Sequence, residues 1–313
     1  MPTAQPPAEV NASRARAMAR KIISHHFSAP PLRLVGQDGG LSNHVFMVKH
    51  KEGDLVVRLS SDPARINAYI KEQWAAAKAK ELKVPAPEIL EVGNQVIPFP
   101  YMVSRRAEGS EATFHPKRLE ILRELGSIAA RINTIQTTGF GTTFDWSNNQ
   151  LSLNDSWEEF LTKELDIESR LGILSKRKML SRLQIRKMSG ILRAMGKKRV
   201  RPSLNHGDLR LKNVLVSREG AIKAVIDWED CISLLPFWEL SVALHDLSID
   251  EKQGFLEGYG LKEPKIVEMT PMVKALNVIN YAPEIERLAE AKDFARLEQY
   301  RTRLSGALDL YCL

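Results

Sequence analysis

In the stretch LNHGDLRLKNVLVS, residues 204–217, His206, Gly207 and Asp208 interrupt a hydrophobic run, and Asn213 follows five residues after Asp208. Ten residues beyond its end, the segment AVIDWED supplies Asp227. The apolar runs VLV and AIKAVI flank a polar four-residue segment, 217–220, and this pattern predicts an antiparallel hairpin. Folding the hairpin brings the residue before its first strand beside the residue after its second. The sequence therefore predicts that Asp208, Asn213 and Asp227 converge at one edge of a small sheet.

The chemistry of these three side chains indicates a ligand. Carboxylate and amide oxygens are hard donors, and Mg²⁺ is commonly held by one or two protein carboxylates together with substrate phosphates. The spacing therefore favours a site for magnesium and a nucleotide phosphate.

The same residues carry a resemblance. The pattern H-G-D-x4-N, followed after a hairpin by I-D-W, resembles the aminoglycoside phosphotransferase and choline kinase-like branch of the protein-kinase-like superfamily. Position by position, the resemblance implies that Asp208 is the catalytic base and that Asn213 and Asp227 are magnesium ligands. His206 would support the catalytic loop. The segment PFWELSVAL, 236–244, also fits the family, although Glu239 stands where aspartate is more usual.

A glycine pair marks the expected nucleotide loop. In GQDGGLSNHVFMV, Gly39 and Gly40 lie between two β-prone runs, where glycines let the backbone approach phosphate oxygens. Read alone, the pair is equally a hairpin turn. Ser42 and Asn43 match the polar end of the family's loop, so the resemblance assigns all four residues to nucleotide binding.

Arginine occupies the place of the family's phosphate-binding lysine. The segment LVVRLS puts Arg58 at that position, and Glu72 in the following helix is its expected partner, unless Glu72 is an ordinary surface residue. Because arginine and lysine are not interchangeable, the sequence does not define how Arg58 would contact the nucleotide phosphates. PYMVSRRAEG resembles the connector between lobes and places adenine contacts near Arg105 and Ala107.

The pattern of elements predicts an α+β chain with a small N-terminal lobe and a larger, mostly helical lobe, and the resemblance implies that this is a two-lobed, protein-kinase-like fold. Residues 32–60 contain three β-prone runs, and a helix is expected to begin near Pro63. We expect 84–93 to be a Pro-punctuated loop and 95–105 to form a further hairpin. Residues 116–135, 154–195 and 236–313 have helical patterns. The predicted divisions are an arm and helix at 1–30, a nucleotide-binding lobe at 31–106 and a mainly helical catalytic and acceptor-binding lobe at 107–313.

Composition narrows the class of protein. With 313 residues, 43% of them hydrophobic, the chain matches an ordinary globular protein of about two domains. No apolar run reaches the roughly 18–20 residues of a membrane span, and the N-terminal segment lacks a secretory h-region. Two cysteines make neither a disulfide framework nor a metal cluster, so a cytoplasmic location is expected.

The net charge of +7 raises a nucleic-acid hypothesis. The densest basic runs, at 175–187 and 196–203, lack zinc-finger spacing or an aromatic RNA-binding motif, and a solvated helix face explains them better.

Acceptor identity is left open by the sequence. The resemblance implies ATP or GTP as donor and a small hydroxylated molecule as acceptor. The acids of NDSWEEFLTKELDIE, 154–168, would suit a polycationic acceptor, but acids at a helix start also favour its dipole. Trp157, Trp228 and Trp238 would suit a sugar or quaternary amine, or pack in the core. A catalytically degenerate nucleotide-binding protein is the main alternative to a kinase, and oligomeric state is not predicted.

Overall fold

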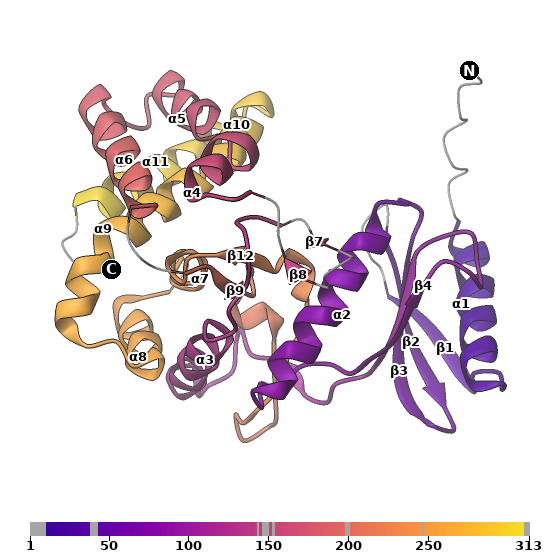
Figure 1. Ribbon diagram of the computed structural model, residues 1–313. Helices are drawn as coiled ribbons and strands as arrows, with labels where there is room; N and C mark the ends of the chain where they lie inside the picture. The colour runs from indigo at the N-terminus through magenta and orange to yellow at the C-terminus, as the bar shows by residue number, and fades with distance from the viewer. Residues whose placement is uncertain are drawn as a thin grey trace, which may run out of the picture.

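The computed structural model describes residues 11–37, 43–142, 144–145, 150–151, 154–197, 201–245 and 247–309. Figure 1 shows two lobes, a sheet with two helices towards the N-terminus and a larger, mainly helical part. The predicted α+β, kinase-like architecture is confirmed. No helix in these ranges is both long and apolar enough to cross a membrane.

The smaller lobe is a five-stranded antiparallel sheet with the order β1-β2-β3-β5-β4. Alternate residues of the central strands, among them Phe46, Val48, Leu55 and Val57, are buried against helix α1. Figure 1 shows α1 on the outer side of the sheet and α2 on the side facing the larger lobe. The elements are α1 Ala12–Phe27, β1 Arg33–Gln37, β2 Asn43–His50, β3 Gly53–Ser60, α2 Arg65–Glu81, β4 Ile89–Gly93 and β5 Tyr101–Arg105.

Two local expectations in this lobe were wrong. Residues 89–93 form strand β4 within the expected loop, and β5 pairs with β4, so 95–105 is not a hairpin of its own. Pro98 and Pro100 have no N–H to donate to a sheet, so strand β5 begins only after them, at Tyr101. The helix begins at Arg65, two residues later than expected.

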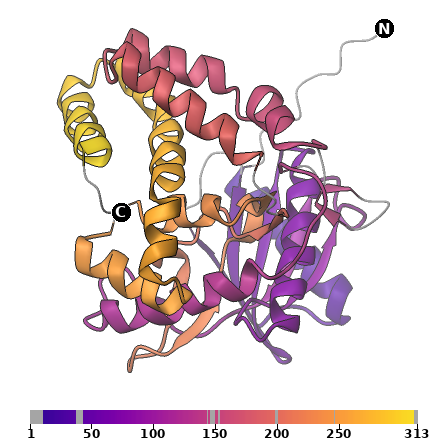
Figure 2. The same ribbon diagram turned by 60° about the vertical axis from the view of Figure 1, so that its left-hand side comes forward.

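The larger lobe is built around short strands and long helices. Helices α5 and α6 pack against α9, α5 also packs against α10, and α4 packs against α6. Figures 1 and 2 show this group on one side of the central strands. The strands are β6 Ser110–Glu111, β7 Phe144–Asp145, β8 Gln150–Leu151, β9 Ser203–Asn205, β10 Val214–Val216, β11 Ile222–Val225 and β12 Ile232–Leu234. The helices are α3 Arg118–Ile132, α4 Trp157–Glu159, α5 Ile167–Lys176, α6 Arg182–Met195, α7 Phe237–Ala243, α8 Ile249–Tyr259, α9 Glu263–Asn280, α10 Ala282–Glu290 and α11 Phe294–Asp309.

Helices α3 and α8 approach closely because glycines stand at their contact. A Cβ at Gly126 would lie 2.0 Å from the Phe255 carbonyl oxygen, and one at Gly258 would lie 1.8 Å from that of Arg123. Larger side chains would force the helices apart. Helix α3 also contacts β9, the strand that precedes the loop carrying Asp208.

Candidate active site

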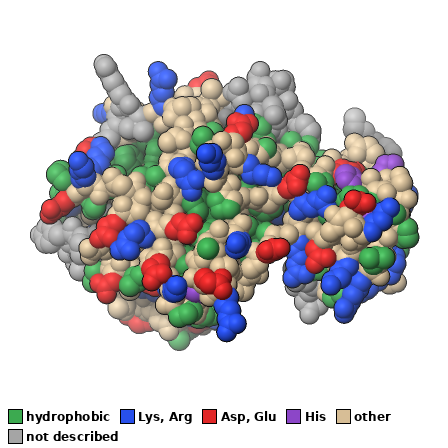
Figure 3. Space-filling view, turned by 90° about the horizontal axis from the view of Figure 1, so that it is seen from below, with side chains coloured by type: hydrophobic (Ala, Val, Ile, Leu, Met, Phe, Trp, Pro, Cys, Tyr) green, Lys and Arg blue, Asp and Glu red, His purple; other side chains and the backbone are tan. Residues whose placement is uncertain are grey.

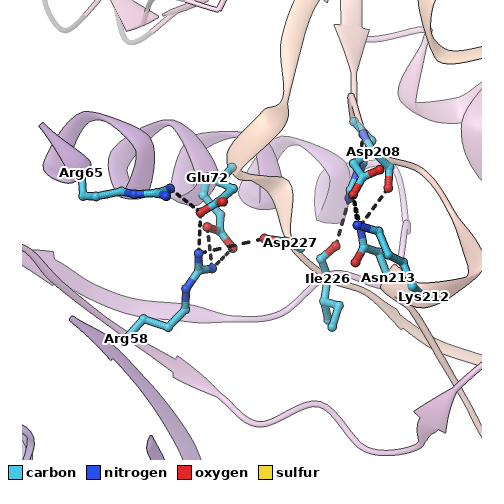
Figure 4. A network of polar contacts seen from close by, with 10 residues as sticks. Arg58, Arg65, Glu72, Asp208, Lys212, Asn213, Ile226 and Asp227 are labelled. Carbon is cyan, nitrogen blue, oxygen red and sulfur yellow. Dashed lines mark hydrogen bonds and ion pairs between the residues drawn. The ribbon is translucent and has the colours of Figure 1, made fainter. Parts of the chain in front are cut away.

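The predicted hairpin forms and brings its two ends together. Strands β10 and β11 pair antiparallel, with Val214 opposite Val225. Just beyond them, the Ile226 amide donates to the Asn213 carbonyl oxygen over 2.9 Å. The Asn213 Nδ2 donates to both the main-chain oxygen and Oδ2 of Asp208, each over 2.9 Å. Asp208, Asn213 and Asp227 therefore lie at one end of the hairpin (Figure 4).

His206 joins the loop of Asp208 to the strand that ends before Asp227. Its ring is fully buried, and burial lowers its pKa to about 4, so it is neutral. Nε2 lies 3.1 Å from the Ile226 carbonyl oxygen, and Nδ1 lies 3.3 Å from the Asp208 amide. These partners assign the proton to Nε2, which donates, while Nδ1 accepts. His206 thus has the supporting role that the sequence predicted.

Gly207 allows the loop to fold tightly between its neighbours. Its φ is +83°, and a Cβ there would lie 2.0 Å from the Asp230 carbonyl oxygen. Both facts favour glycine, which has no Cβ and adopts this region without strain. The turn places Asp208 directly after the buried histidine.

Glu239 stabilises the same loop by a hydrogen bond from the His206 amide. It is fully buried at the start of α7, its carboxylate accepts from the His206 amide, and its own amide donates to Asn205 Oδ1 over 3.0 Å. Burial raises the pKa of Glu239 from its ordinary 4.5 to about 7, against the opposing effect of the loop amides. The glutamate at this position thus serves as a buried acceptor for the catalytic loop.

This burial predicts a pH dependence of stability. The native protein keeps the Glu239 proton at pH values where the unfolded chain has lost it, so the free energy of unfolding falls as pH rises from 4.5 to about 7. Glu239→Gln keeps the acceptor oxygen and removes the titration. We expect the wild type to lose on the order of 2 kcal/mol relative to this variant across that range. Urea unfolding of both proteins at several pH values measures the difference, and parallel pH profiles would contradict the assignment.

Asp208 is held by two cations as well as by Asn213. Arg210 Nε lies 2.5 Å from its Oδ1. Lys212 Nζ lies 2.7 Å from its Oδ2 (Figure 4). Burial would raise the pKa of Asp208, but these two side chains outweigh it and the net pKa is lowered. The carboxylate is therefore ionised at neutral pH, as a proton acceptor must be.

Asp227 lies in an unusual backbone conformation at the opposite side of the site. Its φ of +66° is in the left-handed region, which aspartate tolerates better than most residues. Burial, followed by the nearby Glu229, raises the pKa of its carboxyl, and Arg58 only partly offsets them. The surroundings of Asp227 thus carry an excess of negative charge that a bound cation would relieve.

Arg58 pairs with Glu72 as predicted, and with a second acid that the sequence did not indicate. Arg58 Nη1 lies 2.9 Å from Glu72 Oε2, and its Nη2 lies 2.7 Å from Glu229 Oε2. Arg65 Nη1 also contacts Glu229 Oε2, at 2.8 Å. The network ties strand β3 and helix α2 to the residues that follow Asp227 (Figure 4).

The donor set fits magnesium better than a metal that needs several acids or histidines. In the described ranges, no three His, Cys, Asp or Glu side chains converge in a way that could hold a metal ion. One carboxylate at Asp227 and one amide oxygen at Asn213 are the few protein ligands that Mg²⁺ uses beside nucleotide phosphates. Because Asp208 takes the amide nitrogen of Asn213, the carbonyl oxygen of that amide is the atom that could bind the metal.

The other nucleotide-binding candidates are described only in part. Gly39, Gly40 and Ser42 lie outside the described residues, and Asn43 begins β2 with its side chain not described. The Arg105 amide donates to the Glu88 carbonyl over 2.8 Å, so this group is already used within the protein. Ala107 follows β5 at the connector between the lobes.

A two-lobed fold with this loop, hairpin and ion pair defines a kinase-like phosphotransferase. The model of the phosphotransferase enzyme family matches residues 34–265, most of the chain. The chain belongs to this family of phosphotransferases.

Comparison with solved structures shows the same fold. Aminoglycoside phosphotransferase APH(4)-Ia is 17% identical, with a TM-score of 0.68, and the match covers 93% of this chain and 97% of that one. The GDP and kanamycin complex of APH(2'')-IIIa is 15% identical, with a TM-score of 0.61 and coverage of 91% and 96%. A thermostable APH(4)-Ia mutant in complex with AMP-PNP and hygromycin B is 18% identical, with a TM-score of 0.66 and coverage of 92% and 97%. No curated protein matches the sequence.

Proposed function

We propose that this phosphotransferase moves the γ-phosphoryl group of ATP or GTP to a small acceptor, with Asp208 as base and with Mg²⁺ held by Asn213 and Asp227. The observation that carries the proposal is the convergence of these three residues at the end of the β10–β11 hairpin. Magnesium bound there would offset the negative charge of the phosphates.

Asp208 acts on the acceptor in this mechanism. Its ionised carboxylate orients the acceptor hydroxyl and accepts its proton as the hydroxyl oxygen bonds to the γ-phosphorus. The bond from that phosphorus to the β-phosphate oxygen breaks, and the nucleoside diphosphate leaves. Catalysis depends mainly on positioning and charge neutralisation, because the protein forms no covalent bond itself.

Arg58 and its surroundings would bind the nucleotide. Arg58, oriented by Glu72, would replace the family's lysine at the α- and β-phosphates. Because its Nη1 and Nη2 already contact Glu72 and Glu229, it would act on the phosphates mainly through its positive charge. Gly39, Gly40, Ser42 and Asn43 would cover the phosphates. At the connector, Ala107 is the better candidate for an adenine contact than Arg105, whose amide is engaged.

The nucleic-acid alternative gains no support from the face of the molecule in Figure 3. On the face in Figure 3, lysine and arginine side chains are interspersed with acidic ones instead of forming a continuous basic stripe. A small-molecule acceptor and a cytoplasmic location remain our proposals for the partner and the compartment.

The proposed function is tested by ADP release from Mg-ATP across a panel of hydroxylated compounds. The panel holds aminoglycosides, amino-alcohols, sugars, nucleosides and hydroxy acids, and the Asp208→Asn variant is the blank. We expect release that depends on an acceptor and is absent from the blank. Release that is independent of every acceptor and equal in both proteins would contradict the proposal.

A further inference from the structure

A small cavity lies beside the loop that carries Asp208. Its volume is about 190 Å³, and it reaches from the catalytic loop to helix α3 and the end of α7. The lining is aliphatic apart from one threonine and three cations, and no acid is among the described residues that form it. The aliphatic part includes Leu122, Leu125 and Ala243, and the cations are Arg118, Arg210 and Lys212.

Two of these cations are the side chains that contact Asp208. Lys212 Nζ lies 2.7 Å from Asp208 Oδ2, and about half of the lysine side chain (48%) is exposed. The Asp208 side chain is only 10% exposed. Lys212 thus links the cavity that it lines to the Asp208 carboxylate that it contacts. A cation at this point attracts an anion and repels an amine.

The acidic segment that would suit a polycation is engaged elsewhere. Glu158 and Glu168 both pair with Arg193. Glu159 pairs with Lys163 at 2.5 Å, and Glu164 accepts from the Thr142 amide at 2.9 Å. These contacts give the four acids partners within the protein, without a ligand.

We propose that the acceptor of this kinase carries an anionic group, together with a compact apolar body that occupies the cavity beside Lys212. The inference rests on the proposed function and specifies its substrate class. A cavity of about 150 Å³ accommodates benzene, so the apolar body is about the size of a small branched alkyl group or one ring. The anion draws Lys212 away from Asp208 Oδ2, and that oxygen becomes available to the acceptor hydroxyl.

Binding of three molecules that share one carbon skeleton tests the proposal. Isovalerate, isovaleramide and isoamylamine differ in charge at one end, and NMR titration gives the affinity of each for the full-length protein. We expect isovalerate to bind about tenfold or more tightly than the amide, with the amine weakest, because one charge-assisted contact is worth about that factor. Equal affinity of acid and amide would overturn the proposal.

Three variants locate the binding. Lys212→Met should remove the preference for the acid, whereas Lys223→Met, on the exposed side of β11, should leave it unchanged. Ala243→Leu should weaken all three ligands by filling the cavity. If the buried Ala243→Leu variant does not fold, the test rests on Lys212→Met, because Lys212 is exposed. If Lys212→Met still preferred isovalerate to isovaleramide as strongly as the wild type, the anion site at Lys212 would be refuted.

The Asp208→Asn variant separates this inference from the kinase activity. It removes the charge that competes for Lys212, so it should bind isovalerate at least as tightly as the wild type while transferring phosphate about 10²–10⁴-fold more slowly. In the wild type, β-hydroxyisovalerate should be a better acceptor than its amide. A kinase that phosphorylates amines or neutral sugars and binds no carboxylate would refute the anionic acceptor and leave the phosphotransferase function intact.

Discussion

Asp208→Asn is expected to reduce phosphoryl transfer by about 10²–10⁴-fold while leaving nucleotide affinity near that of the wild type. The amide keeps the size of the carboxylate and one oxygen to accept from Asn213 Nδ2, so the loop should hold its shape. It loses the ability to take a proton from the acceptor hydroxyl. Steady-state turnover gives the rate, and calorimetry with Mg-nucleotide gives the affinity.

A matched control distinguishes this loss from a general effect of the substitution. Asp250→Asn makes the same chemical change at an exposed position in the first turn of α8. We expect it to retain wild-type turnover. Near wild-type activity in Asp208→Asn would remove Asp208 as the base.

Asp227→Ala is expected to abolish the strengthening of nucleotide binding by magnesium. Asp227 supplies the carboxylate of the proposed metal site, and its surroundings, which include Glu229, carry excess negative charge. Loss of residues that only orient a metal ligand weakens metal binding by about 10–100-fold, so loss of the ligand itself should cost more. Calorimetric titration of nucleotide with and without Mg²⁺ measures the effect.

Asp227→Asn is the control for the backbone. Asparagine tolerates the left-handed conformation that Asp227 adopts, whereas alanine adds strain there. Both variants should lose the magnesium effect, and the asparagine variant should keep more of its stability. Unchanged magnesium dependence in both would show that the metal assignment is wrong.

The hairpin end was predictable because its geometry is local. Turn spacing alone brings Asn213 beside Asp227, and the structure bonds Asp208 to Asn213 as well. Glu72 could be anticipated as the partner of Arg58 only through the family resemblance.

Other contacts depend on tertiary packing. Glu229 reaches Arg58 and Arg65 across 171 and 164 residues of sequence, and the only signal was an acid two residues after Asp227. The contact of Lys212 with Asp208 is set by side-chain conformation, which spacing does not define.

Phosphorus NMR of the reaction mixture tests the central claim most directly. With Mg-ATP and an acceptor identified from the panel, we predict a new phosphomonoester signal that grows as the γ-phosphate signal declines, and no such signal with Asp208→Asn. The account would be contradicted if the γ-phosphate appeared only as inorganic phosphate, or if the phosphomonoester formed equally well with the variant.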